Sequence, residues 1–225
     1  MKHIIAIGGG GFTHQASALK LEKYLLAQTT VPTPKVCFLP QASKEDPHYV
    51  IKFLEAFQSL GAIPSWVSLF GRVEDTWKQK LLNADLIYVG GGNTKSMIAL
   101  WKAWGVDEIL REAYQKGTVL AGVSAGAICW FEQGITDSVW PLGVVEGLGI
   151  LEGSFCPHYD SEPERPPVYR EKIATGTIKP GIALEDFTAA HYIDNQLHAI
   201  ISTSQNGKAF KLTPTDTMSL DIKRI

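Results

Sequence analysis

Cysteine and long apolar runs are scarce in this chain, and each scarcity excludes a class of protein. The 225 residues contain three cysteines, Cys37, Cys129 and Cys156, whose odd number and spacing suit neither a disulfide framework nor a metal site. No apolar stretch approaches the roughly 20 residues of a membrane-spanning helix. The segment Met1–Ile7 lacks a signal-type apolar region with a cleavage site and reads as a strand. We therefore expect reduced thiols and a cytoplasmic protein with no membrane partner.

An excess of charge of one sign is also lacking. Lysine and arginine together number 21, aspartate and glutamate number 23, and the net charge is −2. The basic residues form no run or stripe, whereas proteins that bind nucleic acid or anionic membranes concentrate positive charge on one face. The charge pattern therefore argues against both nucleic acid and an anionic membrane surface as the main partner.

What the chain has is a regular alternation of strand-like and helical segments. The predicted strands are 3–7, 35–39, 65–69, 86–89 and a run from 118 to 122, and the predicted helices are 15–27, 47–60, 73–83 and 94–115, the last broken near Gly105. Such alternation implies right-handed crossovers and a mostly parallel sheet with helices on both faces. The sequence therefore predicts an α/β fold, and its length suits one domain over residues 1–225.

The pattern changes after about residue 177, where short apolar runs are separated by turn residues. The runs are 181–184, 189–193, 196–202 and 208–212, with turns such as Asp194-Asn195 and Asn206-Gly207 between them. This pattern is typical of antiparallel hairpins. We expect these hairpins to extend or edge the same sheet.

The segment Gly122-Val123-Ser124-Ala125-Gly126 indicates a nucleophile elbow. It follows an apolar run of strand type and precedes small residues that tolerate a helix, which is the context that this motif requires. Glycines two positions before and after the serine remove β-carbons that would collide within the sharp turn. The pattern predicts an exposed Ser124 as nucleophile, with the peptide N–H of Ala125 pointing where an oxyanion would form.

Two glycine-rich loops follow predicted strands. Gly90-Gly91-Gly92 lacks the glycine, lysine and hydroxyl order of a P-loop, and neither it nor Gly8-Gly9-Gly10-Gly11 fits a dinucleotide fingerprint. Exposed backbone N–H groups in the first loop suit an oxyanion, so Gly91 is the predicted second donor. The second loop reads as a tight turn on the floor of the pocket. We expect no nicotinamide or flavin cofactor.

A histidine in Cys156-Pro157-His158-Tyr159 is the predicted general base. A neutral imidazole can take the serine proton and return it to the leaving amine because its pKa lies near working pH. The base needs a carboxylate to orient it, and three candidates remain open from the residues alone: Asp137, Asp160 and Glu185. An extended chain that turns after His158 argues against Asp160, two residues further on.

Three motifs resemble the peptidase E family of serine peptidases, which includes aspartyl dipeptidase and, more distantly, cyanophycinase. They are Val89-Gly90-Gly91-Gly92-Asn93-Thr94, Gly122-Val123-Ser124-Ala125-Gly126-Ala127 and Cys156-Pro157-His158-Tyr159. The resemblance implies a flavodoxin-like α/β/α sandwich of the class I glutamine amidotransferase type. It also implies Ser124 as nucleophile, His158 as base, Asp137 as the acidic member, and Gly91 and Ala125 as oxyanion donors. No metal or organic cofactor is implied.

The resemblance predicts hydrolysis of short peptides, including those with an N-terminal aspartate. Arg165 or Arg170 would pair with a substrate carboxylate, and Asn93 and Glu185 are further candidates for substrate contacts. Two alternatives stay open: a thiol-dependent amide hydrolase using Cys129 or Cys156, and a non-catalytic module that binds a small ligand. Tryptophans near the predicted site suit either a core or an interface, so a monomer and a homodimer are both compatible with the sequence. They are Trp101, Trp104, Trp130 and Trp140.

Overall fold

A computed structural model describes residues 1–14, 18–73 and 75–225. The helices are α1 (Lys20–Leu26), α2 (Pro47–Ser59), α3 (Trp77–Leu82), α4 (Thr94–Trp104), α5 (Val106–Gln115), α6 (Ala125–Ile128) and α7 (Arg165–Ala174), with a 3₁₀ turn, η2, at Gln41–Ser43. The strands are β1 (His3–Ile7), β2 (Lys35–Leu39), β3 (Ile63–Trp66), β4 (Leu86–Val89), β5 (Val119–Val123), β6 (Phe131–Thr136), β7 (Gly143–Glu146), β8 (Leu151–Cys156), β9 (Gly181–Leu184), β10 (Thr188–Ile193), β11 (Gln196–Ser202), β12 (Ala209–Leu212), β13 (Thr217–Ser219) and β14 (Ile222–Arg224).

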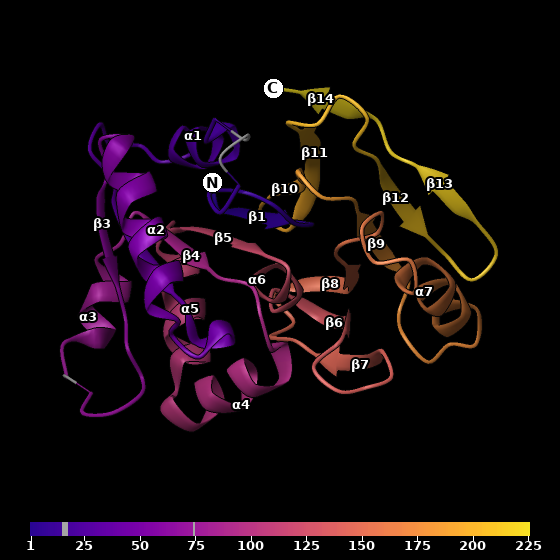
Figure 1. Ribbon diagram of the computed structural model, residues 1–225, viewed down its shortest axis with the longest axis horizontal. Coiled ribbons are helices and arrows are strands. Elements are labelled where there is room, and N and C mark those ends of the chain that lie inside the picture. Colours follow the sequence, from indigo (N-terminus) through magenta and orange to yellow (C-terminus); the bar gives the residue numbers. More distant parts are fainter. Residues whose placement is uncertain (15–17, 74) are drawn as a thin grey trace.

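The central sheet has eight strands in the order β14-β11-β10-β1-β5-β4-β2-β3 (Figure 1). The five strands from β1 to β3 in this order pair in parallel, so their carboxyl ends meet at one edge. Parallel strands in such a sheet are buried on both faces, which explains why β4 and β5 are continuous apolar runs. Ligand sites in these sheets lie beyond the carboxyl ends of the strands.

Helices cover both faces of the central sheet. Alternate residues of each strand point to opposite faces, so Ile5 joins one core and Ile4 the other. The first core contains Phe53 of α2 together with residues of α1, and the second contains Trp101 of α4 together with residues of α3 and α5. The predicted α/β fold with a mostly parallel sheet and helices on both faces is therefore confirmed.

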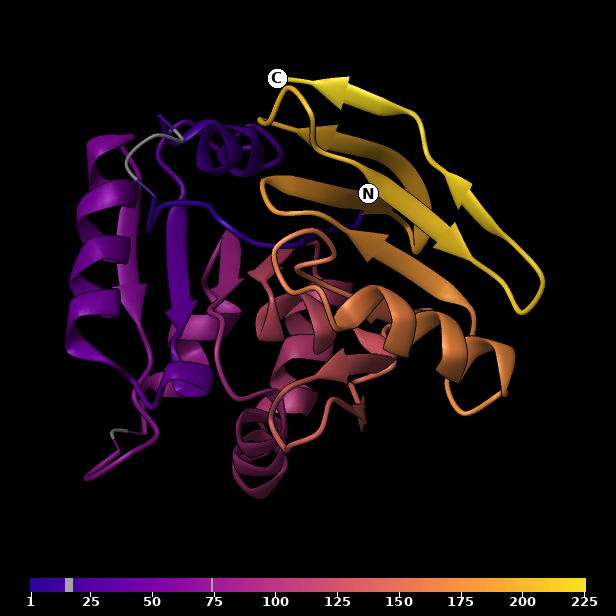
Figure 2. The ribbon, with the colours of Figure 1, turned by 45° about the vertical axis from the view of Figure 1, so that its right-hand side comes forward.

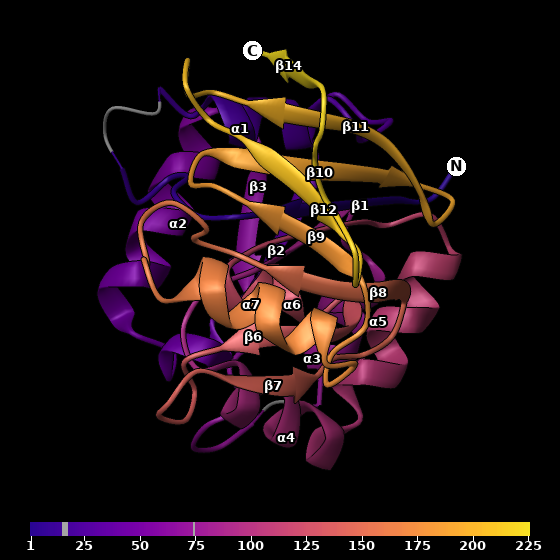
Figure 3. The same cartoon turned by 90° about the vertical axis from the view of Figure 1, so that its right-hand side faces the viewer.

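A second sheet of six strands, in the order β13-β12-β9-β8-β6-β7, lies beside the first. Figures 2 and 3 show α7 crossing the outer face of this sheet, over β8 and β6. Tyr169 and Ile173 of α7 share a buried cluster with Ile135 of β6 and Cys156 of β8. Because α7 covers this face, the last three residues of β6, β8 and β9 are buried on both sides of the sheet.

The placement of the C-terminal hairpins differs in part from the prediction. The predicted strands that correspond to β10 and β11 extend the central sheet, as expected. Strands β9 and β12 belong to the second sheet, so the prediction that all the hairpins join the central sheet was wrong for these two. The reason is that β9 pairs with β8, whose partner β6 already builds a separate layer. The chain then passes from β9 to β10, and so from one sheet to the other, within residues 185–187.

Several boundaries also shift. The third strand covers Ile63–Trp66 rather than 65–69, and its N-terminal end is fixed by the Ile63 N–H, which donates to the Pro34 carbonyl oxygen at 2.8 Å. Helices α1 and α3 are shorter than expected, and residues 15–17 and 74 of the two predicted helices lie outside the described residues. Within the described residues, no helix is long and apolar enough to cross a membrane.

Candidate active site

Ser124 occupies a strained turn between β5 and α6. Its φ of 55° and ψ of −113° lie in a region that residues with a β-carbon rarely adopt. A β-carbon added at Gly122 would lie 2.2 Å from the Gly126 carbonyl oxygen, and one added at Gly126 would lie 2.2 Å from the Val89 carbonyl oxygen. The backbone strain at Ser124 costs on the order of 1 to 3 kcal/mol, and it persists only where the surrounding structure enforces it. The elbow predicted from the sequence is therefore present in the fold.

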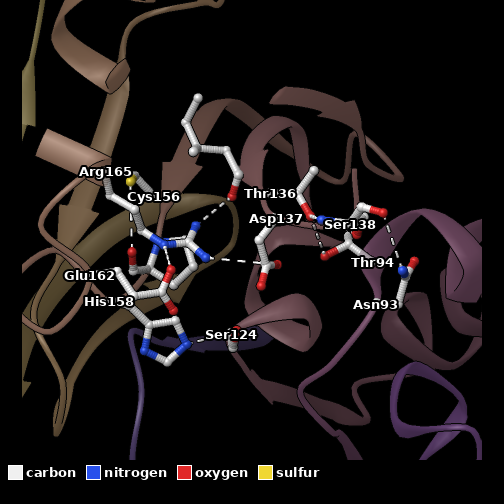
Figure 4. A network of polar contacts seen from close by, with 12 residues as sticks. Asn93, Thr94, Ser124, Thr136, Asp137, Ser138, Cys156, His158, Glu162 and Arg165 are labelled. Carbon is white, nitrogen blue, oxygen red and sulfur yellow. Dashed lines mark hydrogen bonds and ion pairs between the residues drawn. The ribbon is translucent and has the colours of Figure 1, made fainter. Parts of the chain in front are cut away.

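His158 lies just beyond the end of β8 and reaches across to the serine. Its Nε2 is 2.9 Å from Ser124 Oγ, as the dashed line in Figure 4 shows. The residue has a positive φ of 53°, and its backbone N–H donates to the Gly8 carbonyl oxygen at 3.3 Å. This bond ties the histidine loop of the second sheet to the glycine turn after β1. The predicted nucleophile and base are thus within hydrogen-bonding distance.

Asp186 is the carboxylate that contacts the imidazole. Its Oδ1 lies 2.8 Å from His158 Nδ1, on the side of the ring opposite Ser124. The arrangement is satisfied when Nδ1 carries the hydrogen and Nε2 accepts from the serine hydroxyl. Burial acts to raise the pKa of Asp186, but the His158 contact, together with a hydrogen bond from Ser161 and the charge of His14, outweighs it and holds that pKa below its usual range. The carboxylate is therefore ionised and available to stabilise an imidazolium.

Asp137, the acid implied by the family resemblance, is elsewhere, and this expectation needs correction. Its Oδ1 lies 3.9 Å from Arg165 Nη2, and 63% of its side chain is exposed. The reason is strand order: Asp137 follows β6, on one side of β8, whereas Asp186 follows β9, on the other side. The histidine turns toward the β9 side.

The two other acidic candidates support the loop that carries Asp186. Asp160 Oδ1 accepts the Asp186 N–H at 2.9 Å, and Glu185 Oε2 accepts the Lys208 N–H at 2.8 Å. Burial, with smaller contributions from the charges of Asp160 and Asp186, raises the pKa of Glu185. Neither carboxylate is paired with His158. Asp186 directly follows the candidate Glu185 but was not itself predicted from the sequence.

The glycine turn after β1 packs against the histidine and its carboxylate. A β-carbon added at Gly9 would lie 1.9 Å from Asp186 Oδ1 and 2.7 Å from His158 Nδ1. The Phe187 N–H donates to the Gly9 carbonyl oxygen at 2.9 Å, which fixes the next residue of the acidic loop. The turn therefore forms the floor of the site, as the sequence indicated, and only glycine fits there.

The predicted oxyanion donors differ in their present partners. A β-carbon on Gly91 would lie 3.4 Å from Ser124 Cβ, so the glycine loop borders the nucleophile. The Gly91 N–H donates to the Tyr49 hydroxyl at 3.3 Å, a contact for which we find no signal in the sequence. Burial raises the pKa of Tyr49 to about 12, so this hydroxyl stays protonated. Among the described residues, none accepts a hydrogen bond from the Ala125 N–H.

The residues expected to contact substrate have different surroundings. Arg165 is buried, and its Nε and Nη1 donate to Glu162 Oε2 at 2.6 Å and to the Ile135 carbonyl oxygen at 2.9 Å. Arg170 is exposed on α7. Asn93 caps α4 by accepting the Ser96 N–H at 2.8 Å. Arg165 and Asn93 thus have structural partners, and Arg170 is the more accessible arginine.

The two thiols of the alternative hypothesis are both buried. Burial raises the pKa of Cys156 to about 12, and it raises the pKa of Cys129 well above its ordinary value. A cysteine nucleophile must be accessible and ionised. Neither thiol meets this requirement, and neither contacts His158 through a hydrogen bond. Within the ranges that the structure describes, no three His, Cys, Asp or Glu side chains gather as they would around a metal ion.

Comparison with known proteins places these features in a family. A model of peptidase family S51 matches residues 4–200. The uncharacterized peptidase YgaJ of Bacillus subtilis (strain 168) is 47% identical over 212 residues, which cover 94% of this chain and 92% of that protein. The matched region includes the three loops that carry Ser124, His158 and Asp186.

Two solved structures share the fold at low sequence identity. A peptidase from an acI-B1 actinobacterium gives a TM-score of 0.76 at 17% identity, covering 99% of this chain and 95% of that one. A protein of Listeria monocytogenes EGD-e, provisionally assigned as peptidase E, gives 0.60 at 20% identity, covering 99% and 100%. Both structures are therefore similar to this chain in overall fold.

Proposed function

The chain belongs to peptidase family S51 and is therefore a peptidase, and we propose that it cleaves short peptides through an acyl-Ser124 intermediate. The observation that carries this proposal is the continuous chain of hydrogen bonds from Ser124 Oγ through His158 to Asp186, with contacts of 2.9 and 2.8 Å. A nucleophile, a base and an orienting carboxylate in this order are what acyl transfer requires. The buried thiols supply no competing nucleophile.

The proposed reaction follows from these contacts. Ser124 Oγ attacks the carbonyl carbon of the scissile peptide bond, and its proton passes to His158 Nε2. Asp186 stabilises the imidazolium that forms, which then gives the proton to the leaving amine as the carbon–nitrogen bond breaks. A water molecule attacks the acyl-enzyme with the same histidine as base, which releases the acid and restores the serine.

The oxyanion of the tetrahedral intermediate needs donors beside Ser124. The Ala125 N–H is the first, since none of the described residues accepts from it. The Gly91 N–H is the second donor. Its hydrogen bond to the Tyr49 hydroxyl would break, and it would donate to the oxyanion instead. Because the hydroxyl is itself a donor, Tyr49 also stands where it can stabilise that charge.

A restriction to dipeptides, including Asp-X peptides, is the finer part of the proposal. It is supported by the peptidase E resemblance of the three motifs and by Arg170, a cationic side chain exposed on α7. Arg165 is a poor choice for a substrate aspartate because Glu162 already neutralises it. A dipeptide library with every residue at the first position, assayed for released amino acids, tests this restriction. Hydrolysis of long peptides at internal bonds would contradict it.

A fluorophosphonate probe tests the nucleophile. We expect the intact protein to gain the mass of one adduct on the peptide that contains Ser124, and Ser124→Ala to gain none. Ser59→Ala is the matched control, because that hydroxyl only bonds the Ala56 carbonyl oxygen at the end of α2. Labelling of Ser124→Ala at the wild-type rate would show that the nucleophile is another residue.

A further inference from the structure

A buried carboxyl group lies on α1, at one face of the central sheet. Glu22 stands next to Leu21, and both Leu21 and Leu25 of this helix belong to the apolar core of that face. Glu22 is inaccessible to solvent, and among the described residues neither of its carboxyl oxygens has a hydrogen-bond partner. Burial raises the pKa of Glu22, and the backbone N–H groups of Phe12 and of Glu22 itself oppose this effect only in part. Burial therefore favours the neutral acid over the carboxylate.

This carboxyl group packs against the glycine turn that follows β1. A β-carbon added at Gly11 would lie 3.1 Å from Glu22 Oε1 and 3.5 Å from the Tyr88 hydroxyl oxygen. Gly11 has a φ of 88°, and the next residue, Phe12, directs its N–H toward the carboxyl group closely enough to act on the pKa of Glu22. Glu22 is therefore the polar group that lies against the turn from the side of α1.

The ring of Phe12 connects this turn to Tyr49 of α2. The two rings are stacked, with centroids 5.2 Å apart and an angle of 16° between their planes. Phe38 packs edge-on against the same tyrosine at 5.2 Å, and a β-carbon added at Gly90 would lie 2.8 Å from Tyr49 Cε1. The ring of Tyr49 is therefore fixed by three neighbours, and Phe12 is the one that Glu22 contacts through the turn.

The hydroxyl of Tyr49 reaches the loop that borders the nucleophile. Its oxygen accepts the Gly91 N–H at 3.3 Å, and a β-carbon on Gly91 would lie 3.4 Å from Ser124 Cβ. Because the oxygen accepts from Gly91, the hydroxyl hydrogen points away from that N–H and is available to an anionic oxygen beside Ser124. A negative charge on Glu22 would raise the pKa of Tyr49, so the two groups are close enough to influence each other.

We propose that the buried carboxyl group of Glu22 fixes the turn at Gly11 and Phe12 and, through the Phe12 ring, holds the Tyr49 hydroxyl where it donates to the oxyanion. This inference rests on the proposed function, because an oxyanion forms beside Ser124 only if that serine attacks the substrate. Tyr49 is then a catalytic residue, since its hydroxyl contacts the reacting oxygen, and Glu22 is a positioning residue that acts through it. The role requires an oxygen that accepts from Phe12 but no charge.

A double-mutant cycle on the best dipeptide of the library tests whether Glu22 acts through Tyr49. Tyr49→Phe should lower kcat by about 100-fold with KM little changed, as the loss of one oxyanion donor does. Glu22→Leu, which removes both carboxyl oxygens, should lower kcat by about 10-fold because the donor is displaced. In the Tyr49→Phe background the same change should cost less than about twofold, since the group on which Glu22 acts is absent. Losses that multiply in the double variant would overturn the inference.

A conservative substitution separates the positioning role from a general effect on the fold. Glu22→Gln keeps an accepting oxygen without a charge, so we expect it to retain at least about half of the wild-type kcat. A loss as large as that of Glu22→Leu would overturn the inference. If circular dichroism shows that Glu22→Leu does not fold, Phe12→Leu replaces it in the cycle, with the same expected losses. Glu55→Leu, an exposed change on α2, is the matched control and should leave kcat unchanged.

The fluorophosphonate probe separates this inference from the proposed function. Absence of labelling at Ser124 in the wild type would refute the serine mechanism itself. If the wild type is labelled at Ser124 but Tyr49→Phe keeps the wild-type kcat, the hydroxyl does not stabilise the oxyanion. In that case the inference is wrong while the proposed function stands.

Discussion

At the scale of single residues, the site depends on one carboxylate that keeps the imidazole in one tautomer. Asp186 accepts from His158 Nδ1 at 2.8 Å. Asp186→Asn would present an amide there and favour the wrong tautomer, so we expect kcat to fall by about 10⁴-fold. Steady-state hydrolysis of the best dipeptide measures this. Asp160→Asn is the matched change, because among the described residues Asp160 accepts from the Asp186 backbone and does not contact His158, and it should cost far less. Equal losses in the two variants would contradict the role of Asp186.

The thiols give a second prediction at this scale. A thiol with a pKa of about 12, as burial imposes on Cys156, is almost wholly protonated at neutral pH. We expect iodoacetamide to leave turnover unchanged and to alkylate Cys37, Cys129 and Cys156 only after unfolding, since all three are buried. Mass spectrometry of treated protein, native and in denaturant, measures this. Rapid loss of activity with modification of Cys156 would favour a thiol mechanism.

Sequence reasoning identified Ser124 and His158 because each carries a local signal: glycines at fixed offsets for the first, and an apolar run before a turn for the second. The carboxylate has no such signal. Whether an acid reaches His158 depends on which strands flank β8, and strand order is a property of the whole sheet. The family pattern indicated Asp137, whereas the chain supplies Asp186. Tyr49 was missed because a tyrosine in the first turn of a helix gives no hint of a contact with Gly91, which lies 42 residues further along the chain.

At the scale of elements, the elbow works only if helix α6 approaches the strands closely. A methyl group at Gly122 would lie 2.2 Å from the Gly126 carbonyl oxygen, which is backbone and cannot rotate away. We expect Gly122→Ala to lower the free energy of unfolding by about 3 kcal/mol, as overpacking of a rigid site does. Urea denaturation followed by circular dichroism measures the change.

Gly143→Ala is the control for this change. Its added methyl would meet nothing closer than 3.7 Å, and the residue begins the outer strand β7. We expect its unfolding free energy to stay within about 0.5 kcal/mol of the wild type. If both alanine variants were equally stable, the elbow would be less tightly packed than the structure shows.

The elements that could be predicted are those with local periodicity. The strands at 35–39, 86–89, 181–184 and 196–202 have the predicted bounds, and the break of the long helix at Gly105 is correct because that residue has a φ of 70°. Five strands were not predicted, because polar residues or glycine interrupt their apolar pattern: β6, β7, β8, β13 and β14. Their existence depends on partners distant in the chain.

At the scale of the whole molecule, the site lies where the two sheets meet. Ser124 follows β5 of the central sheet, His158 follows β8 of the second, and Asp186 lies in the segment where the chain crosses from one sheet to the other. The Gly8 and Gly9 carbonyl oxygens tie the loops of His158 and Asp186 to the end of β1. The proposed mechanism therefore requires both sheets in their native arrangement, and a loss of either should remove activity together with stability.

A buried histidine makes the stability of the whole fold depend on pH. His191 lies between His3, whose Nδ1 is 2.9 Å from its Nε2, and Tyr24, whose hydroxyl is 2.8 Å from its Nδ1. Burial first, and then the charges of His3 and His198, lower the pKa of His191 from 6.5 to about 4. Between these values the unfolded chain binds more protons than the folded one, so stability rises with pH through this window. The contribution of neutral His191 to the free energy of unfolding is complete above about pH 6.5 and is lost as the pH falls toward 4.

This linkage predicts that the free energy of unfolding falls by about 2 kcal/mol between pH 7 and pH 5 through His191 alone. Other groups titrate in the same range, so the informative quantity is the difference between wild type and His191→Gln in urea titrations at the two pH values. The variant is less stable at pH 7, because it leaves a gap beside Tyr24, but its stability should fall less on acidification. His48→Gln, which changes an exposed histidine near the start of α2, should follow the wild type at both pH values. If the free energy of unfolding of His191→Gln fell as much between pH 7 and pH 5 as that of the wild type, protonation of another group would be what destabilises the fold.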